Sequence, residues 1–138
     1  MACFVTSDVA LVLAVLLLSC GPEEATPVCT TYEPSCSVLY EPTYEQVFGR
    51  TLKPTCAKSG VSCHADTGKQ GGLSFDDADR AYSLLQERGV VKAGDAKCSK
   101  IAVRLTATDP NIRMPPGKAL EPAEICAIQH WIADGAKR

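Results

Sequence analysis

The sequence predicts a small, mostly α-helical domain, and three observations support this prediction. Apolar residues recur at helical spacing in four stretches, and helix-capping residues flank several of them. No stretch shows the clear alternation of apolar and polar residues that is typical of a strand. The chain has 138 residues and a net charge of −2, so it can bury one modest core.

The first expected helix starts after Thr43, which has the spacing of a capping box with Gln46. We expect Pro54 to end this helix, because proline has no amide hydrogen and is poorly tolerated in a helix interior. Four apolar residues fall on one face of the helix: Tyr44, Val47, Phe48 and Leu52.

The next two helices are expected in the middle of the chain. Ser74 and Asp77 provide capping signals for the second helix, and Gly89 should end it. A short third helix should carry Ile101 and Leu105. The second helix has five apolar residues at helical spacing: Ala78, Ala81, Tyr82, Leu84 and Leu85.

The last helix has the clearest signals. Glu121 is expected at its cap, Pro122 at its first position and Gly135 just after its end. An apolar stripe with one large aromatic beside it runs along this helix: Ile125, Ile128, Ile132 and Trp131. Four short helices joined by long loops make a poor bundle by themselves, so we expect something to fill the space between them.

The N-terminus predicts an exported, lipid-anchored protein. Residues 9–18 are all apolar, which is too short for a membrane-spanning helix but suits a signal peptide. Residues 17–21 resemble a bacterial lipobox, which implies a signal peptide over residues 1–19 and a lipid on Cys20. Since Gly21 is not the Asp that retains such proteins at the inner membrane, we expect the lipid anchor in the outer membrane, with the protein on the periplasmic side of the cell envelope.

Residues 20–42 are expected to be the lipidated cysteine and an acidic, proline-rich tether. Residues 21–45 hold five Glu and four Pro but no Lys or Arg, and such a segment cannot bury enough apolar surface to fold alone. Within it, Cys29 and Cys36 would close a small disulfide loop. The folded domain is then expected over residues 43–138.

Two short motifs carry the expected chemistry. Cys56 is followed at a distance by Cys63 and His64, and Met114 lies in an Arg-Met-Pro-Pro-Gly loop before the last helix. A Cys-His pair near the first helix with a methionine in a late loop resembles the order found in small class I cytochromes c. This resemblance implies that Cys63 bonds to haem c and that His64 and Met114 are the two axial ligands of the iron.

The surrounding residues resemble, more specifically, the planctomycete-type cytochrome c domain of bacterial envelope proteins. The segments that carry this resemblance are residues 71–75, 90–94, 113–117 and 131–136. The family implies a class I cytochrome c-like fold with crossed N- and C-terminal helices, which would place Val47 and Phe48 against Ile128 and Trp131. It also implies a monohaem electron-transfer protein with a redox partner protein in the envelope.

The haem-attachment motif departs from the family pattern, which has two residues between its cysteines. Six residues separate Cys56 from Cys63, and Gly60 stands where the first thiol would be. Three states are open: one thioether at Cys63, two thioethers with Cys56 reaching the second vinyl group, or a Cys56–Cys63 disulfide without haem. The last state would complete a disulfide framework with two further pairs, Cys29–Cys36 and Cys98–Cys126.

Charge and motifs argue against other classes of protein. A net charge of −2 does not suit a nucleic-acid-binding protein. The chain has no motif of a serine hydrolase, a zinc protease or a nucleotide-binding protein, so we expect no enzyme activity. The alternative function is a haem-free, disulfide-stapled cytochrome c-like scaffold that acts as a binding or structural lipoprotein.

Overall fold

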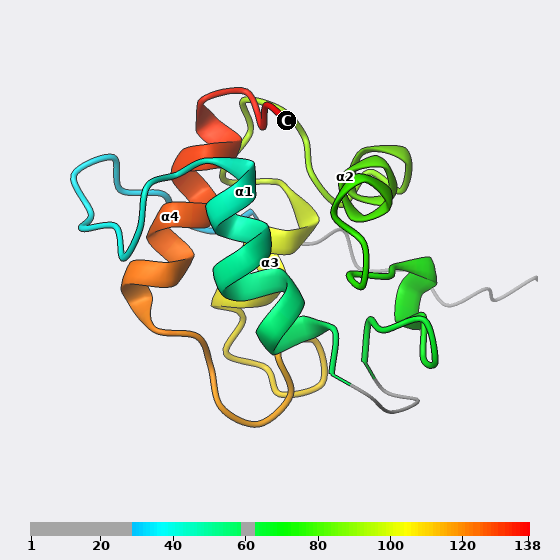
Figure 1. The fold of residues 1–138 in the computed structure, drawn as a ribbon. Helices are drawn as coiled ribbons and strands as arrows, with labels where there is room; N and C mark the ends of the chain where they lie inside the picture. The colour runs from blue at the N-terminus through cyan, green and yellow to red at the C-terminus, as the bar shows by residue number, and fades with distance from the viewer. Residues whose placement is uncertain (1–28, 59–62) are drawn as a thin grey trace, which may run out of the picture.

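The structure is a computed structural model that describes residues 29–58 and 63–138. Within these ranges it contains helices and no strands, as the sequence predicts (Figure 1). The elements are α1 (Tyr44–Val47), the π-helix η1 (Phe48–Cys56), the 3-10 helix η2 (Gln70–Gly72), α2 (Ala78–Glu87), α3 (Lys100–Thr106) and α4 (Pro122–Ala133). None of the helices in the described part combines the length and the apolar character that a membrane span needs.

Some of the sequence predictions concern residues that the structure does not describe. These are the signal peptide over residues 1–19, the lipidated Cys20, the tether up to residue 28, and Gly60.

Capping residues start three of the helices where the sequence predicts. The Thr43 hydroxyl accepts a hydrogen bond from the backbone N–H of Gln46 (3.4 Å), and the Asp77 carboxylate accepts one from Arg80 (2.9 Å). At α4, Glu121 and Glu124 form a reciprocal capping box with Pro122 in the first turn. Local hydrogen bonds between capping side chains and the backbone therefore mark these three helix starts.

The first helix does not end at Pro54, and this part of the prediction is wrong. The chain continues beyond α1 as η1, which contains Pro54 and extends to Cys56. In a π-helix each donor reaches five residues back, and Ala57 donates in this way to the Leu52 carbonyl (3.1 Å). Pro54 removes one donor from this ladder without stopping it, and η1 extends to the partly buried Cys56.

The N-terminal and C-terminal helices pack against each other to form the core. Figure 1 shows α1 lying across α4, and the rings of Tyr44 and Trp131 are 5.5 Å apart between centroids. Val47, Ile128 and Ile132 are fully buried. Burial of side chains of this size contributes roughly 1.5–3 kcal/mol each. This packing of the terminal helices agrees with the mostly α, cytochrome c-like fold that the sequence predicts.

The described part of the expected tether lies against the domain. In Figure 1 the segment of residues 29–42 runs beside α4. The Gln129 side chain donates to the Thr31 carbonyl (2.8 Å), Leu39 donates to the Ala123 carbonyl (3.0 Å), and Tyr40 is buried. The composition of this segment predicts a tether because the segment has no core of its own. In the structure its described residues are instead held against the surface of α4.

Two disulfides join this segment to the domain, and the expected pairings Cys29–Cys36 and Cys98–Cys126 are wrong. The structure instead joins Cys29 to Cys98 and Cys36 to Cys126, across 69 and 90 residues. The pairs follow from the path of residues 29–42 over α3 and α4, which sequence spacing does not reveal. By loop-closure entropy each bond contributes roughly 4–5 kcal/mol, more than a short local loop would.

Candidate functional site

One cavity of about 510 Å³ brings together the four residues singled out for haem binding: Cys56, Cys63, His64 and Met114. Its volume lies within the usual range for small-molecule and cofactor sites, about 300–1,000 Å³. Seven apolar residues form much of its wall: Leu52, Leu73, Phe75, Val90, Ile101, Leu105 and Ile128. Elements that are far apart in the sequence therefore converge on one largely apolar space.

His64 is held in a defined orientation. Its Nδ1 lies 2.8 Å from the Gln70 carbonyl oxygen, and since a carbonyl only accepts, Nδ1 carries the hydrogen of this bond. The neutral ring then keeps a lone pair on Nε2, the usual arrangement of a metal-ligating histidine. Burial lowers the pKa of His64, the hydrogen bond to Gln70 opposes this shift, and Arg104 adds to it.

Cys56 and Cys63 are both free thiols that line the cavity. The backbone N–H of His64 donates to the Cys56 carbonyl (3.0 Å), which fixes the end of η1 beside the Cys-His pair. The pKa of Cys56 is raised to about 12, mainly by burial, with Cys63 and Glu124 contributing to the rise and Lys58 opposing it. Cys56 is therefore a neutral thiol near pH 7, and the Cys56–Cys63 disulfide is not formed in the structure.

Met114 reaches the cavity from a loop that is attached to α3. Its backbone N–H donates to the Arg104 carbonyl (2.9 Å), and its side chain is half-buried. The Arg113 guanidinium donates to the Gly117 carbonyl (2.8 Å) and closes the loop. Gly117 has a φ of +86°, which favours glycine at this turn.

Three basic residues at the cavity are additional to the residues singled out from the sequence. Arg88, Lys100 and Arg104 line it, and none of the described residues that line it is Asp or Glu. Lys100 and Arg104 are four residues apart on α3, so they share a helix face, where like charges repel each other. This spacing beside Ile101 and Leu105 is the sequence signal that could have revealed Lys100 and Arg104. The positive charges of the three basic residues suit a ligand with negative charge.

The structure thus defines a class of site: an apolar cavity with an imidazole, a thioether, two thiols and a basic edge. Residues 61–118 match the family model of planctomycete cytochrome C. The match spans Cys63, His64 and Met114, and together with the helical fold it supports a cytochrome c-like domain over this segment. Searches of curated proteins and of solved structures found no significant match.

Proposed function

We propose that this protein is a monohaem c-type electron carrier, anchored by lipid on the periplasmic side of the bacterial cell envelope. The observation that carries the proposal is that Cys63, His64 and Met114 line one cavity in a domain of the cytochrome c class. The lipid would be attached to Cys20 and placed in the outer membrane, and a redox partner protein would accept or supply the electron.

The residues around the cavity fit a haem. Imidazole nitrogen and thioether sulfur are the axial donors of cytochromes c, and a thiol beside the histidine is the group that attaches haem covalently. The apolar wall suits the porphyrin ring, and the basic edge of Arg88, Lys100 and Arg104 suits its carboxylates. When bound, the haem would supply a one-electron Fe(III)/Fe(II) couple whose potential methionine ligation raises.

The protein's own groups would control how the iron is held. The Gln70 carbonyl fixes the His64 tautomer and increases the basicity of Nε2. The Met114 loop is connected to α3 through the Arg104 carbonyl, so a shift of that helix would move the thioether. If His64 and Met114 both held the iron, no ligand position would be left for oxygen or substrate, which suits a carrier rather than an enzyme.

The disulfides support a location outside the cytoplasm. Cys29–Cys98 and Cys36–Cys126 are the kind of bonds that persist in an oxidising compartment such as the periplasm. The same compartment is where the lipidated N-terminus would place the domain.

Absorption spectroscopy of the full exported chain tests this proposal. Expressed in a host with cytochrome c maturation, it should show a Soret band and sharp α and β bands on reduction, and its haem should stay bound after denaturation. Cys63→Ala should lose covalent haem, whereas Met114→Ala should keep it with a changed spectrum. The α-band of the pyridine complex would report whether Cys56 forms a second thioether. A colourless wild-type protein would overturn the proposal.

The second candidate is a haem-free scaffold that acts as a binding or structural lipoprotein. It is favoured by the long spacing between Cys56 and Cys63, which departs from the attachment motif of the family. The two disulfides would stabilise such a domain without a cofactor. A colourless, folded protein in the experiment above would support this candidate.

A further inference from the structure

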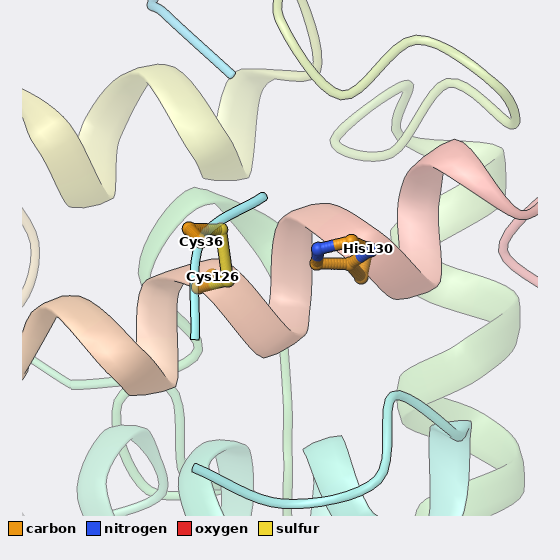
Figure 2. Close-up of side chains that lie close together, drawn as sticks. All are labelled: Cys36, Cys126 and His130. Atoms are coloured by element: carbon orange, nitrogen blue, oxygen red, sulfur yellow. A yellow bond between two sulfur atoms is a disulfide. The ribbon is translucent and has the colours of Figure 1, made fainter. Parts of the chain in front are cut away.

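A second group of side chains that could bind a metal is formed by Cys126 and His130 on α4 together with Cys36, and none of the three lines the cavity. Figure 2 shows the Cys36–Cys126 disulfide with the ring of His130 one turn further along the helix, on the same side. The two sulfur atoms and a ring nitrogen of His130 all lie within 4.8 Å of one another. In the described ranges no other three residues among His, Cys, Asp and Glu meet this distance.

The position of each ligand is supported by contacts other than the disulfide. Cys126 and His130 are four residues apart on one helix, which places them on the same face. The Tyr32 hydroxyl is 3.1 Å from His130 Nδ1, and the two rings pack edge to face. These contacts hold the imidazole in one orientation beside Cys126.

The chain on both sides of Cys36 is attached to α4 by hydrogen bonds. Before it, the Thr31 carbonyl accepts from the Gln129 side chain (2.8 Å), and after it, Leu39 donates to the Ala123 carbonyl (3.0 Å). Both bonds would survive cleavage of the disulfide. The Cys36 sulfur would therefore stay close to Cys126 and His130 in the reduced protein.

We propose that the Cys36–Cys126 disulfide is a redox-controlled cover of a metal site, and that its reduction lets Cys36, Cys126 and His130 bind one thiophilic cation, Zn(II) or Cu(I). Two thiolates and an imidazole are the donors that such soft d10 ions prefer. In the oxidised protein the two sulfur atoms are bonded to each other and are not thiolate donors. The site would thus be open only under reducing conditions.

A dithiol protein of the thioredoxin class is the reductant that this step requires. Its thiolate would attack the half-buried Cys36 sulfur, because Cys126 is only 2% exposed. The Cys126 thiolate would leave, and the second donor thiol would then release Cys36 and form the donor's own disulfide. Two electrons and two protons pass from the dithiol to the cysteines, and the bound cation later displaces the thiol protons.

Metal titration of the full exported chain tests this proposal. The background is Cys56→Ser with Cys63→Ser, which removes the thiols of the cavity. The protein is titrated with Zn(II) or Cu(I) against a chromophoric chelator of each ion, before and after reduction by a phosphine. We expect one ion per chain after reduction only. His130→Gln should weaken binding at least about tenfold, and Cys36→Ser with Cys126→Ser should abolish it.

A matched pair of variants separates this site from thiol binding in general. Cys29→Ser with Cys98→Ser also removes one disulfide but leaves the three proposed ligands, so it should bind the ion as the background does. Failure of the reduced background to bind either ion would overturn the proposal. Equal affinity in His130→Gln, or binding that depends on Cys29 and Cys98, would overturn it as well. Circular dichroism of each variant confirms that the helices are retained.

Discussion

The two sides of α4 use cysteine in opposite ways. On one side, Cys126 bonds to Cys36 and fastens residues 29–42 to the helix. On the other side, Ile128 faces a cavity in which Cys56 and Cys63 remain free thiols. The first region is stabilised covalently by the chain itself, whereas the second presents unbonded donors around an apolar space. The disulfides therefore complete the fold and leave the cavity cysteines available for chemistry.

The largest loss of folding stability should come from replacing the disulfide-bonded cysteines, not from replacing the free ones. Cys36→Ser with Cys126→Ser should lower the free energy of unfolding by roughly 4 kcal/mol, because it frees a 90-residue loop in the unfolded chain. Cys56→Ser with Cys63→Ser, in the haem-free protein, should lower it by about 1 kcal/mol or less. Urea unfolding of both variants measures the difference. Equal losses would contradict the division between the two regions.

The sequence predicts the helices and the donors of the cavity because their signals are local. Capping pairs such as Glu121 with Glu124 mark a helix by themselves, and a Cys-His pair with a single later methionine is visible without a fold. The disulfide partners are not predictable in this way. They depend on where residues 29–42 pack, and that position is fixed by contacts such as the one between Tyr32 and His130, 98 residues apart.

Local sequence signals also do not predict two other features, the continuation of the first helix past Pro54 and the basic edge of the cavity. The helix passes Pro54 because π-helical bonding continues around it, and propensity rules treat proline as a stop. The sequence does not reveal the basic edge, because Arg88 directly follows α2 whereas Lys100 lies on α3. Arg88 and Lys100 are far apart in the sequence, so the sequence does not show that they line the same cavity. Only Lys100 and Arg104 have helical spacing.

A smaller loss of folding stability should follow from replacing Tyr44, which belongs to the packed core beside α4. Its hydroxyl donates to the Ala78 carbonyl (2.7 Å), so Tyr44→Phe should cost about 1 kcal/mol near pH 7. Burial raises the pKa of Tyr44 from 10.0 to about 12, with Asp79 and Asp77 adding to the shift and Arg138 opposing it. The unfolded phenol ionises first, so this contribution is present below pH 10 and is lost as pH rises through about 12.

Stability measurements at several pH values check this assignment. The stability difference between wild type and Tyr44→Phe should shrink as pH rises from 10 to 12, because phenylalanine does not titrate. Tyr82→Phe is the matched control for loss of a hydroxyl, since Tyr82 also donates to a backbone carbonyl, that of Ala136 (3.0 Å). A difference between wild type and Tyr44→Phe that stays constant over this range would contradict the assignment.

The smallest effect on stability, and the sharpest test of the cavity, should come from its basic edge. Lys100→Gln with Arg104→Gln removes two like charges that repel each other on α3, and it also removes the hydrogen bond from Arg104 to the Ile112 carbonyl (3.3 Å). Because these two effects oppose each other, the stability of the haem-free protein should change by no more than a few tenths of a kcal/mol. The same change should weaken binding of free haem, because the carboxylates lose their cationic partners. Lys92→Gln with Lys97→Gln, at exposed positions outside the cavity lining, should change neither quantity. Titration with haem and with its dimethyl ester separates charge from shape, since the ester should bind both double variants equally. The ester could instead distinguish the two double variants as strongly as haem does. Lys100 and Arg104 would then act by packing and not by charge. The ligand-binding character of the cavity would in that case depend on its thiols, His64 and Met114 alone.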